Sequence, residues 1–300
     1  MTPKILPQFE FSENVLLARA PAKINLSLLI GDKRADGYHN LETIMAKIAF
    51  YDELRFEMTE NEKLEFSCDG LWSPDGKENL VYKTAELFYK TIDKKPSAKI
   101  KLTKNIPAGS GLGGASSDAA TTLLALNKLH NEILNEGIIY ELSAKLGSDV
   151  SFFLNGPLAL CTGRGEKVEK IDKKPDFNAI LVLPDINIST KRVYEAFEED
   201  MASFNSFRLQ IREYIREGKI DIIQKMCVNM LAKTCFALDN RLALLQVKIK
   251  EITRLPVCLS GSGSALFVVY DGKDCRDIEC FRREIDSLGC YNIIIISNEW

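Results

Sequence analysis

The densest chemical signal in the sequence is a glycine-rich bend, in which Gly109, Gly111, Gly113 and Gly114 fall within six residues. Glycine lets backbone N–H groups turn inward and lets a ligand approach the main chain closely. The segment that follows, with helix-starting serines and then an apolar face, predicts a helix from about residue 116 to 131. Because a helix N-terminus carries unpaired N–H groups and a partial positive charge, phosphate is the expected ligand of this bend.

Other known classes of glycine-rich loop fit the sequence less well. A Walker loop needs Lys-Ser or Lys-Thr after its last glycine, where this chain has Ala115 and Ser116. A dinucleotide-binding loop matches at Gly109, Gly111 and Gly114, but it needs an acid-ending strand about 20 residues later, where this chain continues as helix. A plain turn into a helix needs fewer glycines. A nucleotide triphosphate cradle of another type is favoured, and a dinucleotide oxidoreductase stays open as an alternative.

Composition limits the class of protein. The chain has 300 residues, 39 basic and 42 acidic, a net charge of −3 and 46% hydrophobic residues. These values indicate a soluble globular protein with one large domain or two. Nucleic-acid binding is not expected without a basic excess, and a membrane span is not expected without an apolar run of about 18 residues. The first residues lack the basic-then-apolar order of a signal peptide, which favours a cytoplasmic protein.

The eight cysteines form no C-x-x-C pair, and several lie in apolar segments. They are expected to be reduced and mostly buried thiols of a cytoplasmic protein. A zinc site is not expected, since the spacing is wrong and only His39 and His130 could supply imidazole.

The predicted elements mix strands and helices without strict alternation, which favours an α+β fold. Apolar side chains alternate at Ile24, Leu26, Leu28 and Ile30, as expected for a strand. Residues 169–177, with charges and a proline, are the best candidate linker. Expected strands are 15–30, 54–58, 64–66, 99–103, 151–161, 179–183, 255–270 (bent at its glycines) and 292–297. Expected helices are 79–90, 116–131, 138–147, 191–198, 206–216, 219–232, 237–252 and 273–288.

Three segments, taken together, resemble the GHMP kinases. PAGSGLGGASSDAA (107–120) resembles the phosphate-binding motif of that family, APAKINLSL (20–28) its first motif and LSGSGSALF (259–267) its third. The resemblance implies a two-domain α+β fold with ATP and substrate in the cleft between the domains. We expect an N-terminal ATP-binding and catalytic domain over 1–172 and a C-terminal substrate domain over 173–300.

The segments around ADGYHN (35–40) and LGSDVSFFL (146–154) resemble one branch of the family. That branch uses ATP and Mg²⁺ to phosphorylate the 2-hydroxyl of a small molecule, a cytidine diphosphate-linked sugar alcohol of the non-mevalonate isoprenoid pathway. A homoserine or mevalonate type of kinase is an alternative. A non-catalytic nucleotide-binding relative is another, although such a protein would typically lose Lys23 or Asp149, and both are present.

The resemblance assigns catalysis to Lys23 and Asp149. Phosphoryl transfer needs alignment, charge neutralisation and a group that takes the proton of the acceptor alcohol. Asp149, expected at the edge of an apolar strand, would be the partly desolvated proton acceptor. Lys23 would lie on the polar face of its strand and stabilise developing charge. In the alternative structural interpretation, Asp149 is a turn residue and Lys23 an ordinary strand-edge lysine.

The resemblance also implies binding residues. Tyr38 is expected to stack on cytosine and His39 to hydrogen-bond its edge, with Tyr194 as a second aromatic wall. Asn25, Gly261 and Gly263 are further candidates for substrate contacts, and Asn79 and Lys104 for contacts near adenine or ribose. Asn79 could equally be a helix cap, Tyr194 a packing residue and Lys104 a solvated charge. The candidate phosphate-binding residues are Pro107, Ala108, Gly109, Ser110, Gly111, Leu112, Gly113, Gly114, Ala115, Ser116 and Ser117. The sequence assigns neither protein ligands of Mg²⁺ nor an oligomeric state.

Overall fold

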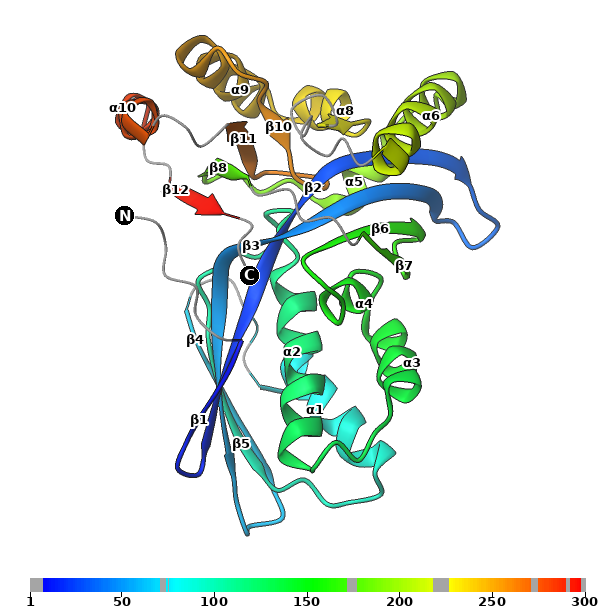
Figure 1. Ribbon diagram of the computed structural model, residues 1–300, viewed down its shortest axis with the longest axis vertical. Coiled ribbons are helices and arrows are strands. Elements are labelled where there is room, and N and C mark those ends of the chain that lie inside the picture. Colours follow the sequence, from blue (N-terminus) through cyan, green and yellow to red (C-terminus); the bar gives the residue numbers. More distant parts are fainter. Residues whose placement is uncertain are drawn as a thin grey trace.

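The computed structural model describes residues 8–70, 74, 76–171, 177–217, 227–270, 275–289 and 292–297. Its helices and strands are mixed along the chain without strict alternation, which confirms the α+β class (Figure 1). Within these residues, no helix is both long enough and apolar enough to cross a membrane.

The first sheet is built around two long antiparallel strands that run together across the molecule (Figure 1). In this sheet β2 and β3 lie between β1 and β5, β4 pairs with β5, β6 joins β3 and β7 extends β6. The strands are β1 (Phe9–Ser12), β2 (Val15–Lys33), β3 (His39–Met58), β4 (Leu64–Asp69), β5 (Ala98–Thr103), β6 (Leu158–Gly163) and β7 (Lys167–Lys170).

The strand predicted over 15–30 is confirmed as β2, but β3 is much longer than the predicted strand at 54–58. Its first half is buried on both faces, from Glu42 to Ile48, so no alternation of apolar and polar residues marks it in the sequence. Tertiary pairing with β2 and β6, rather than local pattern, therefore makes this segment a strand.

The second sheet has the order β10-β11-β8-β12, all pairs antiparallel. Its strands are β8 (Asn178–Leu183), β10 (Cys258–Leu259), β11 (Leu266–Tyr270) and β12 (Asn292–Ser297). Helices α8 (Ala232–Leu238), α9 (Asn240–Thr253) and α10 (Cys275–Asp286) lie around it (Figure 1). One strand, β9 (Val228–Asn229), instead pairs with β2 of the first sheet.

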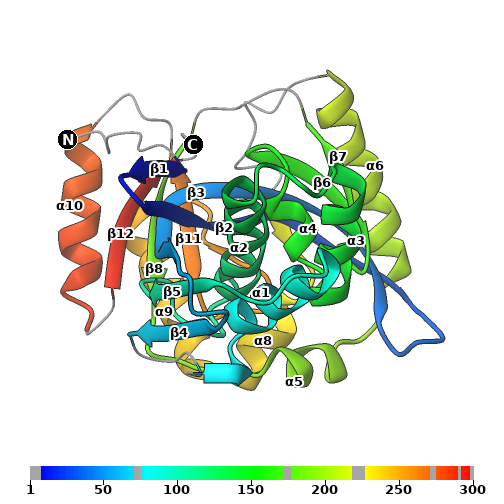
Figure 2. The ribbon, with the colours of Figure 1, turned by 90° about the horizontal axis from the view of Figure 1, so that it is seen from below.

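The first sheet also packs against a layer of helices, in which α2 contacts β2 and β3. These helices are η1 (Gly76–Glu78), α1 (Leu80–Thr91), α2 (Gly114–Leu129), α3 (Glu136–Leu146) and α4 (Val150–Phe153). Seen from below, α2 lies centrally over the long strands (Figure 2). Its buried residues Leu123 and Leu126 join the core with Phe56 and Phe88. This packing fixes the N-terminus of α2 at the junction of the two sheets.

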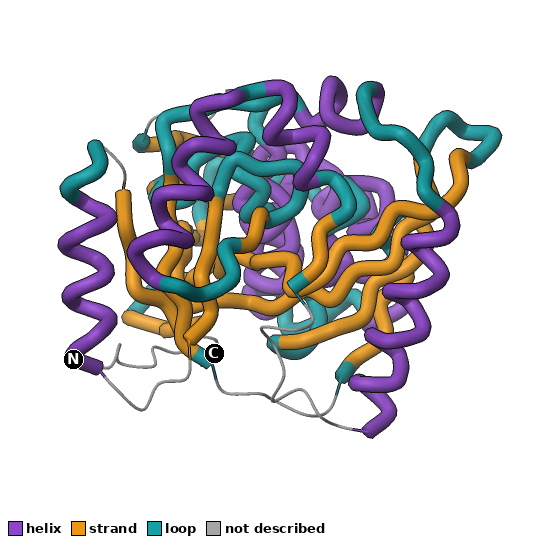
Figure 3. The backbone as a smooth tube through the Cα atoms, turned by 90° about the horizontal axis from the view of Figure 1, so that it is seen from above, coloured by secondary structure: helices purple, strands orange, loops and turns teal. Residues whose placement is uncertain are grey.

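Helices α5 (Thr190–Glu195) and α6 (Met201–Glu217) follow β8. Figure 3 shows helices on both flanks of the strands, and Figure 1 shows α6 above the β2–β3 hairpin. The buried Glu42 of β3 accepts hydrogen bonds from Arg208 Nε (3.0 Å) and Arg212 Nε (2.9 Å) of α6. An ion-pair network therefore ties α6 to the hairpin.

Three predicted elements are corrected. The strand over 151–161 is wrong in its first half, because residues 150–153 form α4 and β6 begins at Leu158; a short buried apolar run does not distinguish helix from strand. The helix over 219–232 lies outside the described residues up to 226, and β9 occupies 228–229. The helix over 237–252 is two helices, since Asp239 leaves helical geometry and caps α9.

The predicted linker over 169–177 begins in β7, and residues 172–176 lie outside the described part. The proposed domain boundary at 172/173 falls in this gap. The strands of the first sheet precede this gap in the sequence and those of the second sheet follow it. The exception is β9, which follows the gap but pairs with β2 of the first sheet.

Candidate active site

Lys23 and Asn25 lie on the inner face of β2, opposite the apolar face of Ile24 and Leu26. The backbone N–H of Lys23 donates to Leu112 O (2.9 Å), so this strand is bonded directly to the glycine bend. The Lys23 ammonium donates to Asn25 Oδ1, and Asn25 Nδ2 donates to Thr43 Oγ1 (2.8 Å). This chain of hydrogen bonds fixes both polar side chains in a buried site.

Asp149 is the N-cap residue of α4, not the edge of a strand as predicted. The chain reaches it through α3 and the turn at Gly147, and α4 then buries Phe152 and Phe153 against α2. The Asp149 side chain keeps 32% of its surface exposed, so one face of the carboxylate points to open space.

Lys23 and Asp149 meet although they are far apart in sequence. Their nearest atoms, Lys23 Nζ and Asp149 Oδ2, are 3.8 Å apart. Burial lowers the pKa of the Lys23 ammonium, and the charge of Asp149 opposes that shift. The pair can therefore orient an acceptor hydroxyl, take its proton and offset the charge that develops on the phosphoryl group.

The glycine bend lies directly on this pair. A Cβ at Gly113 would be 3.1 Å from Lys23 Cγ, and the φ of Gly113 is +71°, so glycine is required here for conformation and for space. Helix α2 begins at Gly114, two residues before the predicted start. The N–H of Ser117 bonds to Gly113 O (2.9 Å) and closes its first turn.

The third glycine segment packs against the bend from the second sheet. Ser260 Oγ donates to Gly111 O (2.9 Å), and the N–H of Ala265 donates to Ser110 O (3.0 Å). A Cβ at Gly261 would lie 3.4 Å from Asn25 Oδ1, so Gly261 is at the site. Gly263 faces Cys235 Sγ instead and is a packing residue of the turn.

A cavity of about 190 Å³ lies where these segments converge. Its lining includes both charged residues and parts of every motif: Lys23, Asn25, Thr43, Gly111, Gly113, Asp149, Thr190, Tyr194, Gly261 and Ser262. One concave site therefore joins the first strand, the glycine bend, the α4 turn and the third motif.

The aromatic candidates lie at different depths. His39 is buried, with Nδ1 3.0 Å from Gly31 O, and its ring is 6.3 Å from that of Tyr194. Burial raises the pKa of the Tyr194 hydroxyl, and Tyr194 lines the cavity. Tyr38 is 56% exposed and does not line it; the guanidinium of Arg164 lies over its ring at 5.2 Å from the centroid.

Asn79 and Lys104 make contacts within the protein. Asn79 caps α1, as its Oδ1 accepts from the N–H of Val81 (2.9 Å). Lys104 is buried rather than solvated: its ammonium bonds to the carboxylates of Asp52 and Asp118. Neither side chain lines the cavity of Lys23 and Asp149.

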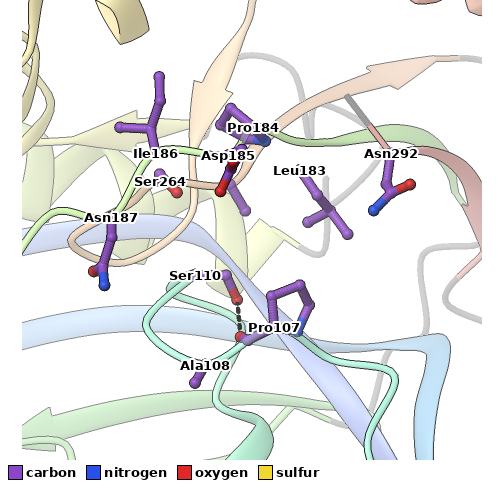
Figure 4. A pocket seen from close by; sticks show the side chains of 11 residues that line it. Pro107, Ala108, Ser110, Leu183, Pro184, Asp185, Ile186, Asn187, Ser264 and Asn292 are labelled. Carbon is purple, nitrogen blue, oxygen red and sulfur yellow. Dashed lines mark hydrogen bonds between the residues drawn. The ribbon is translucent and has the colours of Figure 1, made fainter. Parts of the chain in front are cut away.

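The other side of the glycine bend borders a second cavity of about 380 Å³ (Figure 4). Pro107, Ala108 and Ser110 line it together with Asp185 and Asn187, and Ser110 Oγ donates to Pro107 O (2.7 Å). The predicted phosphate-binding run thus divides between two cavities, with Gly111 and Gly113 lining the one that contains Lys23 and Asp149.

The first turn of α2 carries the remaining candidates. Leu112 and Ser117 are buried, Ser116 is half-buried and Ala115 is exposed. Ser117 Oγ is buried without a hydrogen-bond partner. In the part of the chain that the structure describes, no cluster of three or more His, Cys, Asp or Glu could hold a metal ion.

Comparison with known proteins agrees with this arrangement. The family model described as "GHMP kinases N terminal domain" matches residues 79–157. The 4-diphosphocytidyl-2-C-methyl-D-erythritol kinase of Bacillus subtilis is 38% identical over 263 residues, covering 86% of this chain and 90% of that one. That of Pelotomaculum thermopropionicum is 35% identical, covering 91% and 95%. The chain belongs to the GHMP kinase family.

Solved structures agree. A crystal structure of 4-(cytidine 5'-diphospho)-2C-methyl-D-erythritol kinase has a TM-score of 0.75 at 30% identity, covering 93% of this chain and 98% of that one. A homoserine kinase from Cytophaga hutchinsonii also reaches 0.75, covering 97% of each chain, but at 15% identity it shows the shared fold alone.

Sequence analysis missed one buried cation of this GHMP kinase. Lys47 lies opposite Lys23 in the β2–β3 register, and its ammonium donates to Phe153 O (2.9 Å) and Asn155 O (2.7 Å) at the end of α4. Burial lowers the pKa of Lys47 to about 8. The signal was a single lysine inside the apolar run IMAKIAF. Thr43, Thr190 and Ser262 were also missed, since isolated hydroxyl residues carry no sequence signal.

Proposed function

We propose that this GHMP kinase transfers the γ-phosphoryl group of ATP to the 2-hydroxyl of 4-diphosphocytidyl-2-C-methyl-D-erythritol. The observation that carries the proposal is the Lys23–Asp149 pair, which lies beside Gly113 of the glycine bend in one cavity. The names and the extent of the relatives support the choice of acceptor.

In this mechanism the acceptor oxygen attacks the γ-phosphorus, a new O–P bond forms and the bond to the β-phosphate oxygen breaks. Asp149 takes the hydroxyl proton, while Lys23 keeps the carboxylate ionised and neutralises charge on the transferred group. Asn25 orients Lys23 through its Oδ1. The amides of Gly111 and Gly113, at the N-terminal end of α2, hold the phosphates.

ATP and Mg²⁺ are the expected co-substrate and metal. Mg²⁺ prefers phosphate and water oxygens, so few protein ligands are needed. The Ser117 hydroxyl, buried and unpartnered in the first turn of α2, and the neighbouring Ser116 are the residues that fit phosphate or metal-bound water. When bound, Mg²⁺ would neutralise charge on the β- and γ-phosphates.

We propose that Tyr38, His39 and Tyr194 select the cytidine end of the substrate. Tyr194 lines the cavity, and the buried His39 lies behind it with its ring 6.3 Å from that of Tyr194. The exposed Tyr38 lies outside the cavity with the Arg164 guanidinium over its ring. A flat base can stack on such rings. Gly261 would approach the substrate phosphates, Gly263 would support that turn, and Asn79 would lie toward the adenosine.

We also propose the domain boundary at 172/173, with substrate and ATP between the two parts. A cytoplasmic location fits the cysteines, of which Cys161, Cys235 and Cys258 are buried thiols outside any disulfide.

A substrate panel tests the function. ADP release is measured with ATP, Mg²⁺ and one acceptor at a time: the cytidine diphosphate-linked methylerythritol, mevalonate, homoserine or galactose. We expect turnover only with the first, and its loss in Lys23→Ala and Asp149→Ala. Turnover with homoserine alone would refute the proposed substrate but keep the kinase class.

A further inference from the structure

Three charged side chains are buried together beneath the glycine bend. Asp52 of β3 is fully buried, and the side chains of Lys104 and Asp118 are only 6% and 3% exposed. The Lys104 ammonium donates to both carboxylates, at 2.8 Å to Asp118 Oδ2 and in a short bond to Asp52. We call these residues the positioning cluster.

The positioning cluster joins the two ends of the bend. On the entry side, Asp52 Oδ1 accepts hydrogen bonds from the backbone N–H groups of Asn105 (2.6 Å) and Ile106 (2.8 Å). On the exit side, Asp118 comes directly after the first turn of α2, and a Cβ at Gly114 would lie 3.1 Å from Lys104 Nζ. The seven residues between, 107–113, form a loop whose two ends are held by one ammonium.

The two acidic side chains hold the Lys104 ammonium in place between them. Two carboxylates share one ammonium away from water; burial raises the pKa of Asp118 to about 8, while both carboxylates raise the pKa of Lys104 against its own burial. Asp118 Oδ1 has no hydrogen-bond partner, and Asp118 Oδ2 accepts the hydrogen bond from the Lys104 ammonium. Removing Lys104 would leave two buried acidic groups without their cation, whereas removing Asp52 would release the backbone N–H groups that it accepts from.

We infer that Asp52, Lys104 and Asp118 position the glycine bend for nucleotide binding without contacting the nucleotide. This inference rests on the proposed function only in taking the bend as the site of ATP. It replaces the expected contact of Lys104 with adenosine, because the ammonium is buried between two carboxylates. Asp52, which sequence analysis did not single out, becomes a positioning residue for ATP.

Binding of Mg-ATP, measured by titration calorimetry, tests the inference. Asp52→Asn and Lys104→Met should each weaken ATP binding by about tenfold or more, the scale typical of residues that orient a binding group from behind. The double variant should be little weaker than either single one, since both break the same cluster. The KM for the acceptor should stay within about twofold of its original value, since the acceptor contacts other residues.

The matched control is Lys101→Met, which removes an exposed lysine paired with Asp69 on neighbouring strands. It should leave ATP affinity unchanged. If Asp52→Asn does not fold, as judged by circular dichroism, the same comparison of single and double variants is made with Asp118→Asn and Lys104→Met.

Unchanged ATP affinity in Asp52→Asn, or additive losses in the double variant, would overturn the inference and indicate direct contact by Lys104. These outcomes are separable from the proposed function. A wild-type protein that binds ATP but phosphorylates no acceptor would refute that function, while the affinity cycle still decides the role of the cluster.

Discussion

At the scale of single residues, the proposed chemistry depends on a lysine and an aspartate that come from different segments. Lys23 is held by Asn25 and by the backbone of the glycine bend, whereas Asp149 is held by the α4 turn. Each is thus fixed by its own element, and their 3.8 Å separation leaves room for an acceptor oxygen to approach both.

Lys23→Met and Asp149→Asn should each lower kcat by about 10²–10⁴-fold, the usual scale for an acid–base contact. ATP affinity should change little. Burial lowers the pKa of Lys23, which means that holding its charge in the folded protein is unfavourable. Lys23→Met is therefore not expected to have a lower free energy of unfolding than the wild type. Steady-state kinetics with thermal unfolding checks this; a loss of activity that parallels a loss of stability would contradict it.

At the scale of elements, the four-residue helix α4 is held at both ends by lysines that face each other across β2 and β3. Lys23 pairs with its N-cap Asp149, and Lys47 donates to carbonyl groups at its C-terminal end. Positive charge at a helix C-terminus is favourable. The register Lys23↔Lys47 therefore sets the position of the Asp149 carboxylate.

The lowered pKa of Lys47 predicts that the free energy of unfolding depends on pH. Its folded pKa of about 8 lies below the ordinary value of 10.5, so between these pH values the unfolded chain binds more protons and stability rises with pH. Over this pH range, Lys47 should raise the free energy of unfolding by up to about 3 kcal/mol. Lys47→Met should lack it, whereas Lys99→Met, at an exposed position, should keep it. Urea unfolding at pH 7 to 10.5 measures the difference; parallel curves for Lys47→Met and wild type would disprove it.

At the scale of the whole molecule, the site exists only because the two sheets meet at two glycine turns. Gly111 lies so close to the third motif that a Cβ would be 2.1 Å from Ser260 O. Because Ser260 O is a backbone atom, it can move away only if the main chain is displaced. Hydrogen bonds from Ser260 and Ala265 to the bend complete the junction.

Gly111→Ala should therefore separate the turns. The φ of +79° and the clash together predict a loss of about 2–4 kcal/mol in the free energy of unfolding and a large fall in kcat. Gly76→Ala is the control, since its φ of +67° carries the same backbone strain in open space; it should cost about 1–2 kcal/mol and keep activity. Equal losses in the two variants would show that the junction is not packed as described.

The sequence by itself determined the α+β class, the strand of Lys23, the glycine bend and most of the helix that follows it, because alternation, glycine spacing and capping residues are local properties. It also supplied the family. It did not determine β3, α4 or the buried roles of Lys47, Asp52 and Lys104, because these depend on partners from other elements or on burial from both faces. Only the tertiary structure could decide which charges are paired and buried, since desolvation belongs to the packed chain and not to the residue.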